Sequence, residues 1–144
     1  GFNYRITDIQ CALGISQLKK INSFLKKRRD IAKLYNKAFG KNKNIILPKE
    51  SKFSKSVWHI YPIQFKSADR KKIFDKLREQ SIGAQVHYMP LHLHPFYQKK
   101  FGYKKGDFPV AEKYYEQAIT IPLFPKMADK DAKRVIAAVK LYAK

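Results

Sequence analysis

Stretches with the periodicity of amphipathic helices alternate with short runs of β-branched and aromatic residues along this chain of 144 residues. The run at 57–65 (VWHIYPIQF) is the densest in residues that favour strands. A long helical pattern precedes it at 22–39, and both patterns recur to the end of the chain. This alternation excludes an all-α or all-β domain. It predicts a small α/β layer, a sheet with helices packed on it, behind two leading helices.

Capping and stop signals place the helices. Thr7-Asp8-Ile9-Gln10 has the pattern of a capping box, and Gly40 is a natural stop for the second helix. Ser67 is predicted to cap the third helix, and Pro109 to occupy the first turn of a later one. In the second helix, residues 26–30 are expected to face solvent. The helices so predicted cover about 8–20, 22–39, 68–80, 96–101, 109–118 and 129–142.

Four strands are predicted between these helices, at 45–47, 57–65, 84–88 and 120–123. Pro62 removes a donor from the hydrogen-bonding ladder of the second strand. That strand is therefore expected either at an edge of the sheet or interrupted at the proline.

The net charge of the chain suggests polyanion binding, but the type and distribution of its basic residues do not. With 31 basic and 11 acidic residues, the net charge is +20. Only six of the basic residues are arginine, whereas bidentate recognition of phosphates and bases relies on guanidinium groups. The lysines are also spread over every segment. A solvated lysine-biased surface is therefore favoured over a nucleic-acid site, which stays open as the competing hypothesis.

Targeting and redox features are few. No apolar run is long enough to span a membrane, and the first residues do not form a signal peptide. Cys11 is the single cysteine, so an internal disulfide is excluded, as suits a reducing cytoplasm. The chain starts without methionine, and we expect it to be a piece of a longer protein.

His87, His92 and His94 lie within eight residues and raise the question of a metal site. No cysteine is near them, and no acidic residue occurs between Glu79 and Asp107. Zinc sites need more converging ligands than this, so no metal is predicted. Two alternatives are left open: a loop at a strand end where His87 and Tyr88 reach a ligand, or a buried, hydrogen-bonded imidazole.

Other chemical motifs are lacking. There is no glycine-rich phosphate loop, and no serine lies in a nucleophile elbow. The aromatic residues at 96–103 could stack on a base, but a satellite cluster under a loop is favoured. The residues alone thus predict an α/β domain with a polar loop around Tyr88.

Three ordered motifs carry a resemblance to a known family. The opening GFNYRITDIQCALGISQLKKI resembles G-x-N-x-R-x-T-D-x-Q-A-A-L-G-x-x-Q-L of the DegT/DnrJ/EryC1/StrS sugar-nucleotide aminotransferases. QVHYMPLHLHPFYQ and GDFPVAEKYYEQAITIPLFP are similar to the second and third signatures of that family. The form HYMPLHLHPFY is most similar to members that aminate the C4 ketone of a UDP-linked 6-deoxy-N-acetyl sugar, in the pseudaminic-acid branch.

The resemblance implies a fold-type-I, pyridoxal-phosphate-dependent enzyme that works as a cytoplasmic homodimer. Residues 1–144 would be its C-terminal portion. Within it, 1–40 would lie at the junction of large domain and dimer partner, and 41–144 would form the small domain. The lysine that binds the cofactor would lie upstream, so the chain alone should be inactive.

Residue roles follow from the same resemblance. Asn3 matches an asparagine that reaches the cofactor phosphate of the partner subunit, and Arg5 an arginine near the sugar nucleotide. A purely structural role for Arg5, a salt bridge to Asp8, is the alternative to this ligand contact. His87 and Tyr88 match residues of the substrate pocket, where His87 would assist proton transfer, and His92 is a further candidate for a substrate contact.

The implied reaction moves an amino group from glutamate to a keto-sugar nucleotide, for a cell-surface or flagellar glycan. No nucleic acid, membrane or metal is expected as a partner. The competing hypothesis is a non-catalytic basic domain that binds nucleic acid or a protein.

Overall fold

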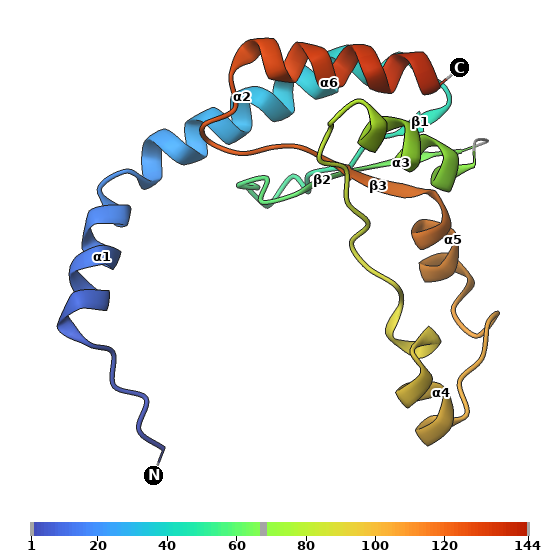
Figure 1. Cartoon of the computed structure of the whole chain (residues 1–144), viewed down its shortest axis with the longest axis horizontal. Coiled ribbons are helices and arrows are strands. Elements are labelled where there is room, and N and C mark those ends of the chain that lie inside the picture. The colour runs from blue at the N-terminus through green and yellow to red at the C-terminus, as the bar shows by residue number, and fades with distance from the viewer. Residues whose placement is uncertain (1, 67–68, 144) are drawn as a thin grey trace.

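The computed structural model describes residues 2–66 and 69–143. The chain forms an open arch, with α1 as one arm, α4 and α5 as the other, and the sheet with α2, α3 and α6 between them (Figure 1). The elements, in order, are α1 (Asp8–Leu18), α2 (Ile21–Phe39), β1 (Ile45–Ile46), β2 (Tyr61–Phe65), α3 (Arg70–Glu79), the 3-10 turn η1 (Leu91–Leu93), α4 (Pro95–Phe101), α5 (Pro109–Gln117), β3 (Ala118–Ile121) and α6 (Asp129–Tyr142).

The sheet is antiparallel, in the order β1-β2-β3. Ile45 pairs with Phe65, and Pro62 pairs with Thr120. β2 is thus the central strand and runs through Pro62 without a break, so both an edge position and an interruption at the proline were wrong. Pro62 is tolerated because β1 covers only the last two residues of β2, and Pro62 has a neighbour on the β3 side alone.

The hydrophobic core lies between the sheet and the layer of α2, α3 and α6. Tyr61, Ile63 and Phe65 alternate inward along β2 while Pro62 and Gln64 are half-buried. Tyr35 of α2 is fully buried, and its hydroxyl donates to the Pro122 carbonyl oxygen at 2.7 Å. The largest buried partners are Phe39, Leu77, Ile119, Ile121, Met127 and Val139. Each fully buried side chain of this size contributes about 1.5–3 kcal/mol, so this layer is what holds the domain together.

α1 begins as the capping box predicts. The Gln10 amide nitrogen donates to the Thr7 hydroxyl oxygen, and the Thr7 amide nitrogen donates to Gln10 Oε1 at 2.9 Å. None of its residues is buried, however, and Leu13 and Leu18 are more than half exposed. The helix therefore rests on local interactions alone.

The first half of α2 corrects one prediction. Arg28 and Arg29 do not face solvent but are half-buried. The Arg28 Nη1 atom donates to the carbonyl oxygens of Trp58, His59 and Leu123 at 3.1–3.2 Å, and Arg29 Nε donates to the Ser56 carbonyl oxygen. Both side chains therefore anchor α2 to the segment that leads into β2.

Further elements differ from prediction, among them β3, which covers Ala118–Ile121 rather than 120–123. β2 begins only at Tyr61, because Trp58 has a φ of 51°, which no strand accommodates. α3 is capped by Asp69, whose carboxylate accepts from the amides of Lys71 and Lys72. The cap at Ser67 and a helix start at 68 lie outside the described residues. A strand over 84–88 was wrong: only Gln85 bridges to Thr120.

The helices at 95–101, 109–117 and 129–142 agree with the predicted ones within a residue. No described helix is both long enough and apolar enough to cross a bilayer.

Candidate functional site

His87 lies where the chain leaves the sheet next to β3. Gln85 and Thr120 exchange both main-chain hydrogen bonds, Gln85 N to Thr120 O at 3.0 Å and Thr120 N to Gln85 O at 2.8 Å. Two residues on, His87 Nδ1 lies 2.9 Å from the Thr120 hydroxyl oxygen. The imidazole also stands edge-on to the Tyr88 ring, with centroids 4.7 Å apart. The ring of His87 is therefore held by β3 on one side and by Tyr88 on the other.

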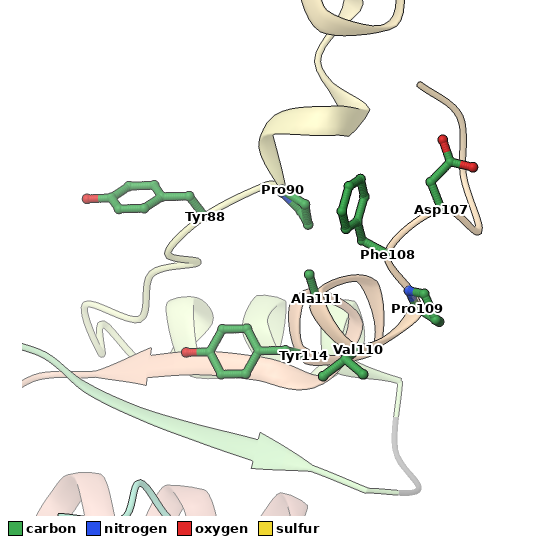
Figure 2. Close-up of a pocket in the computed structure, with 8 residues that line it drawn as sticks. All are labelled: Tyr88, Pro90, Asp107, Phe108, Pro109, Val110, Ala111 and Tyr114. Atoms are coloured by element: carbon green, nitrogen blue, oxygen red, sulfur yellow. The ribbon is translucent and has the colours of Figure 1, made fainter. Parts of the chain in front are cut away.

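Tyr88 lies at a groove of about 670 Å³, of which Figure 2 shows the lining residues. The rings of Tyr88 and Tyr114 extend in the same direction in this view, and Pro90 and Phe108 also line the groove. The Tyr88 side chain is 75% exposed, whereas burial raises the pKa of the Tyr114 phenol. Most of the lining residues are apolar, and Tyr88 offers an exposed phenol to a ligand.

His92 has a different environment from His87. Its Nε2 lies 2.8 Å from Glu112 Oε1, and both residues are only 6% exposed. Glu112 also accepts hydrogen bonds from the amides of Gly106 and Phe108, and the Phe108 ring packs on the His92 ring at 4.7 Å. This pair ties η1 to the first turn of α5 and to the loop before it.

These contacts lower the pKa of the Glu112 carboxyl. The hydrogen bond from His92 is the largest cause, and the Gly106 and Phe108 amides act in the same direction, against the effect of burial. All three favour the ionised carboxylate. Glu112 is therefore an anion that organises the loop, with its oxygens already committed.

Replacing Glu112 with glutamine is expected to lower the melting temperature of the chain by roughly 5–10 °C at pH 7. An amide offers one acceptor oxygen, and its NH2 group would face the Gly106 amide or His92. Thermal denaturation followed by circular dichroism measures the effect. Glu116→Gln is the matched control, because Glu116 lies on the same helix and, among the described residues, pairs only with exposed Lys105 at 3.3 Å.

The same comparison has a pH dependence. The folded-state pKa of Glu112 is depressed, so its stabilisation is present above the unfolded carboxyl pKa of about 4.3 and is lost as pH falls through the folded value. The gap between wild type and Glu112→Gln should therefore narrow below about pH 4. Equal melting temperatures of Glu112→Gln and Glu116→Gln at pH 7 would contradict the role of Glu112 as the anion that organises this loop.

Asn3 and Arg5 lie at the far arm of the arch, in the exposed segment before α1. Arg5 Nε donates to Asn3 Oδ1 at 2.9 Å. The Asn3 amide nitrogen and the two Arg5 Nη atoms have no partner among the described residues. These side-chain nitrogens can thus donate to a ligand, and no ion pair joins Arg5 to Asp8 in the described chain.

The structure therefore brings together His87 and Tyr88, with His92 nearby but directed to Glu112, and it separates Asn3 and Arg5 from them. No group of three histidine, cysteine, aspartate or glutamate residues is arranged for a metal in the described part of the chain. The aromatic residues at 96–103 continue ring to ring into Phe108 and thereby into the groove wall.

Sequence reasoning missed two polar residues of this region. Glu112 had a usable signal, since an acidic side chain in the first turn of a helix can accept from the amides that precede it. Thr120 had none, because only the pairing of β3 with Gln85 brings its hydroxyl to His87.

Two curated relatives have names that state a role. The chain is 38% identical over 145 residues to the spore coat polysaccharide biosynthesis protein SpsC of Bacillus subtilis, covering 97% of this chain and 37% of that protein. It is 40% identical over 138 residues to a UDP-4-amino-4,6-dideoxy-N-acetyl-beta-L-altrosamine transaminase of Campylobacter jejuni, covering 94% and 36%. The chain thus spans little more than a third of the length of these curated relatives.

The solved structure of Helicobacter pylori PseC, an aminotransferase of pseudaminic acid biosynthesis, is similar throughout. The TM-score is 0.88 at 30% identity, and the match covers 99% of this chain and 38% of PseC. The fold is therefore that of part of an aminotransferase. The DegT/DnrJ/EryC1/StrS aminotransferase family model matches residues 1–140. The chain belongs to this family.

Proposed function

We propose that this chain is the C-terminal portion of a cytoplasmic, homodimeric aminotransferase that uses pyridoxal phosphate to move an amino group from glutamate to a keto-sugar nucleotide. A UDP-linked 4-keto-6-deoxy-N-acetyl sugar is the proposed acceptor, for a cell-surface or flagellar glycan. The observation that carries the proposal is the match of residues 1–140 to the family. The names of the Campylobacter and Bacillus relatives support the sugar class and its use in polysaccharides.

The residues at the N-terminal arm suit the phosphate of the cofactor. Asn3 exposes an amide and Arg5 a guanidinium, and both groups can donate hydrogen bonds. The hydrogen bond between them uses Arg5 Nε and Asn3 Oδ1, which leaves the Asn3 nitrogen and the two Arg5 Nη atoms to donate elsewhere. Phosphate oxygens accept such bonds. We assign Asn3 to the cofactor phosphate of the partner subunit and Arg5 to the diphosphate of the sugar nucleotide. The cofactor, when bound, supplies the electron sink for amino transfer.

The residues at the other arm suit the sugar. With Nδ1 at Thr120, His87 offers Nε2 to a sugar hydroxyl or to a proton in transfer. Tyr88 offers its exposed phenol beside it. His92 lines a second cavity of about 420 Å³ next to Pro90 and Phe108, where a ligand could touch it. His92 is therefore the second candidate for a substrate contact.

The division of the chain follows the same proposal. Residues 1–40 hold the segment with Asn3, α1 and α2, and lie at the junction with the large domain and the dimer partner. Residues 41–144 form the small domain. The exposed apolar side chains of α1 support a covered position for it in the parent protein.

The experiment is an assay of the full-length parent protein with pyridoxal phosphate, glutamate and a set of UDP- and dTDP-linked keto sugars. We expect glutamate-dependent amination, fastest with the UDP-4-keto-6-deoxy-N-acetyl sugar. The 144-residue chain alone, which lacks the family's upstream lysine, should give no product. A parent protein that aminates none of the sugars would contradict the proposal.

The net charge of +20 favours one other function, nucleic-acid binding. We expect binding of the chain to DNA to be weak, indifferent to sequence and lost near about 0.15 M salt, because scattered lysines make only electrostatic contacts. Fluorescence anisotropy with two unrelated duplexes, measured across a salt series, tests this. Submicromolar, sequence-dependent affinity at that salt would favour the nucleic-acid function instead.

A further inference from the structure

Thr120 has a double connection to the segment that carries His87. Its main chain bridges to Gln85, and its hydroxyl meets His87 Nδ1 at 2.9 Å. The side chain of Thr120 is buried, with 7% of the residue exposed. Because β3 packs in the core, this hydroxyl is part of a rigid strand, whereas His87 lies outside any strand or helix. The rigid member of the pair is therefore the threonine.

A hydrogen bond at one ring nitrogen decides what the other nitrogen can do. A hydroxyl can both donate and accept, unlike a carbonyl or a carboxylate. When the Thr120 hydroxyl donates to Nδ1, the neutral imidazole of His87 carries its proton on Nε2. When His87 is protonated on both nitrogens, the same hydroxyl accepts from Nδ1. The contact is thus compatible with both protonation states of the ring.

No described atom makes a hydrogen bond to His87 Nε2. The ring is half-buried, and the neighbouring Tyr88 ring lines the groove. The arrangement leaves Nε2 as the nitrogen that can meet a ligand, and Nδ1 as the nitrogen by which the ring is oriented.

We propose that Thr120 is a positioning residue for His87: its hydroxyl holds Nδ1 in either protonation state and directs Nε2 to the bound sugar. This assignment rests on the proposed function for the role of Nε2, but the orientation of the ring by Thr120 can be measured without substrate. Thr120 itself touches no reacting atom. Replacing Thr120 with a side chain of the same shape that lacks the hydroxyl removes the hydrogen bond to His87 and preserves the strand.

Thr120→Val is that variant, and Thr120→Ser restores the hydroxyl. In the 15N-labelled chain at a pH where histidines are neutral, long-range proton–nitrogen spectra report the tautomer of each ring. We expect the tautomer populations of His87 to change in Thr120→Val and to keep their wild-type values in Thr120→Ser. His59, His92 and His94 are internal controls whose signals should stay in place. If valine disturbs β3, Thr120→Ala removes the same hydroxyl.

In the parent enzyme, Thr120→Val should lower the turnover of the keto sugar roughly tenfold or more, with Thr120→Ser within about threefold of wild type. Unchanged His87 signals in Thr120→Val would overturn the proposal, as would equal losses of turnover in the valine and serine variants. Failure of the proposed function is distinguishable: the parent would then aminate no keto sugar, while Thr120→Val would still change the His87 tautomer.

Discussion

Replacing His87 with alanine in the parent enzyme is expected to lower the turnover of the keto sugar roughly a hundredfold, because a positioned general acid–base group contributes at least that factor. Cofactor binding should stay nearly intact, since His87 lies beside β3 of the sheet, whereas Asn3 lies in the exposed segment before α1. Steady-state kinetics with glutamate in excess give kcat and KM for the sugar. Absorbance of the bound cofactor gives its retention.

His94→Ala is the matched control for this variant. His94 lies seven residues after His87, between η1 and α4, and in the described part of the chain its Nε2 contacts only the Met89 carbonyl oxygen, at 3.3 Å. Its removal should change turnover little. Equal turnover in the two alanine variants would exclude His87 from proton transfer. A raised KM with unchanged kcat in His87→Ala would leave it only a binding role.

Replacing Asn3 with alanine is expected to weaken retention of pyridoxal phosphate, because one neutral donor to a phosphate oxygen is lost. The expected effect is about 1–3 kcal/mol, or roughly 5- to 150-fold in the dissociation constant. Equilibrium dialysis of the parent enzyme measures it. Tyr4→Phe, in the same exposed segment, is a control that should retain the cofactor as wild type does.

Mixed dimers test from which subunit Asn3 acts. One subunit carries Asn3→Ala, and the other lacks the family's upstream lysine. If Asn3 acts across the interface, both lesions fall in one site and the second site is intact, so mixing restores activity. If Asn3 acts within its own subunit, each site carries one lesion, and no site in the mixture regains wild-type retention of the cofactor or wild-type activity.

Local signals predicted the helices better than the strands. The capping box at Thr7 and the proline at 109 act within one turn, so α1 and α5 begin where these residues indicate. A strand needs a partner as well as propensity. Residues 84–88 have suitable side chains, yet only Gln85 reaches β3, because the chain then turns towards η1.

The polar residues of the site show the same limit. His87 and Tyr88 could be singled out from the motif that contains them, but their surroundings could not. Thr120 is 33 residues from His87 along the chain, and Glu112 is 20 residues from His92. Arg28 was expected to face solvent. The sequence could not show otherwise, because its three carbonyl partners are distant along the chain and come near Arg28 only in the folded structure. Tertiary pairing, not local preference, determines these contacts.

The exposure of α1 has a consequence for hydrogen exchange. A helix of 11 residues with no buried side chain is held by its capping box and its own ladder, and such a short helix is marginal in water. Its amides in the isolated chain should open with almost no free-energy cost, while those of β2 and β3 exchange only on global unfolding. Protection of residues 8–18 therefore reports directly on whatever covers the helix, whether the preceding domain or a partner subunit. Deuterium uptake in this one peptide can thus follow assembly of the parent protein without any enzymatic assay.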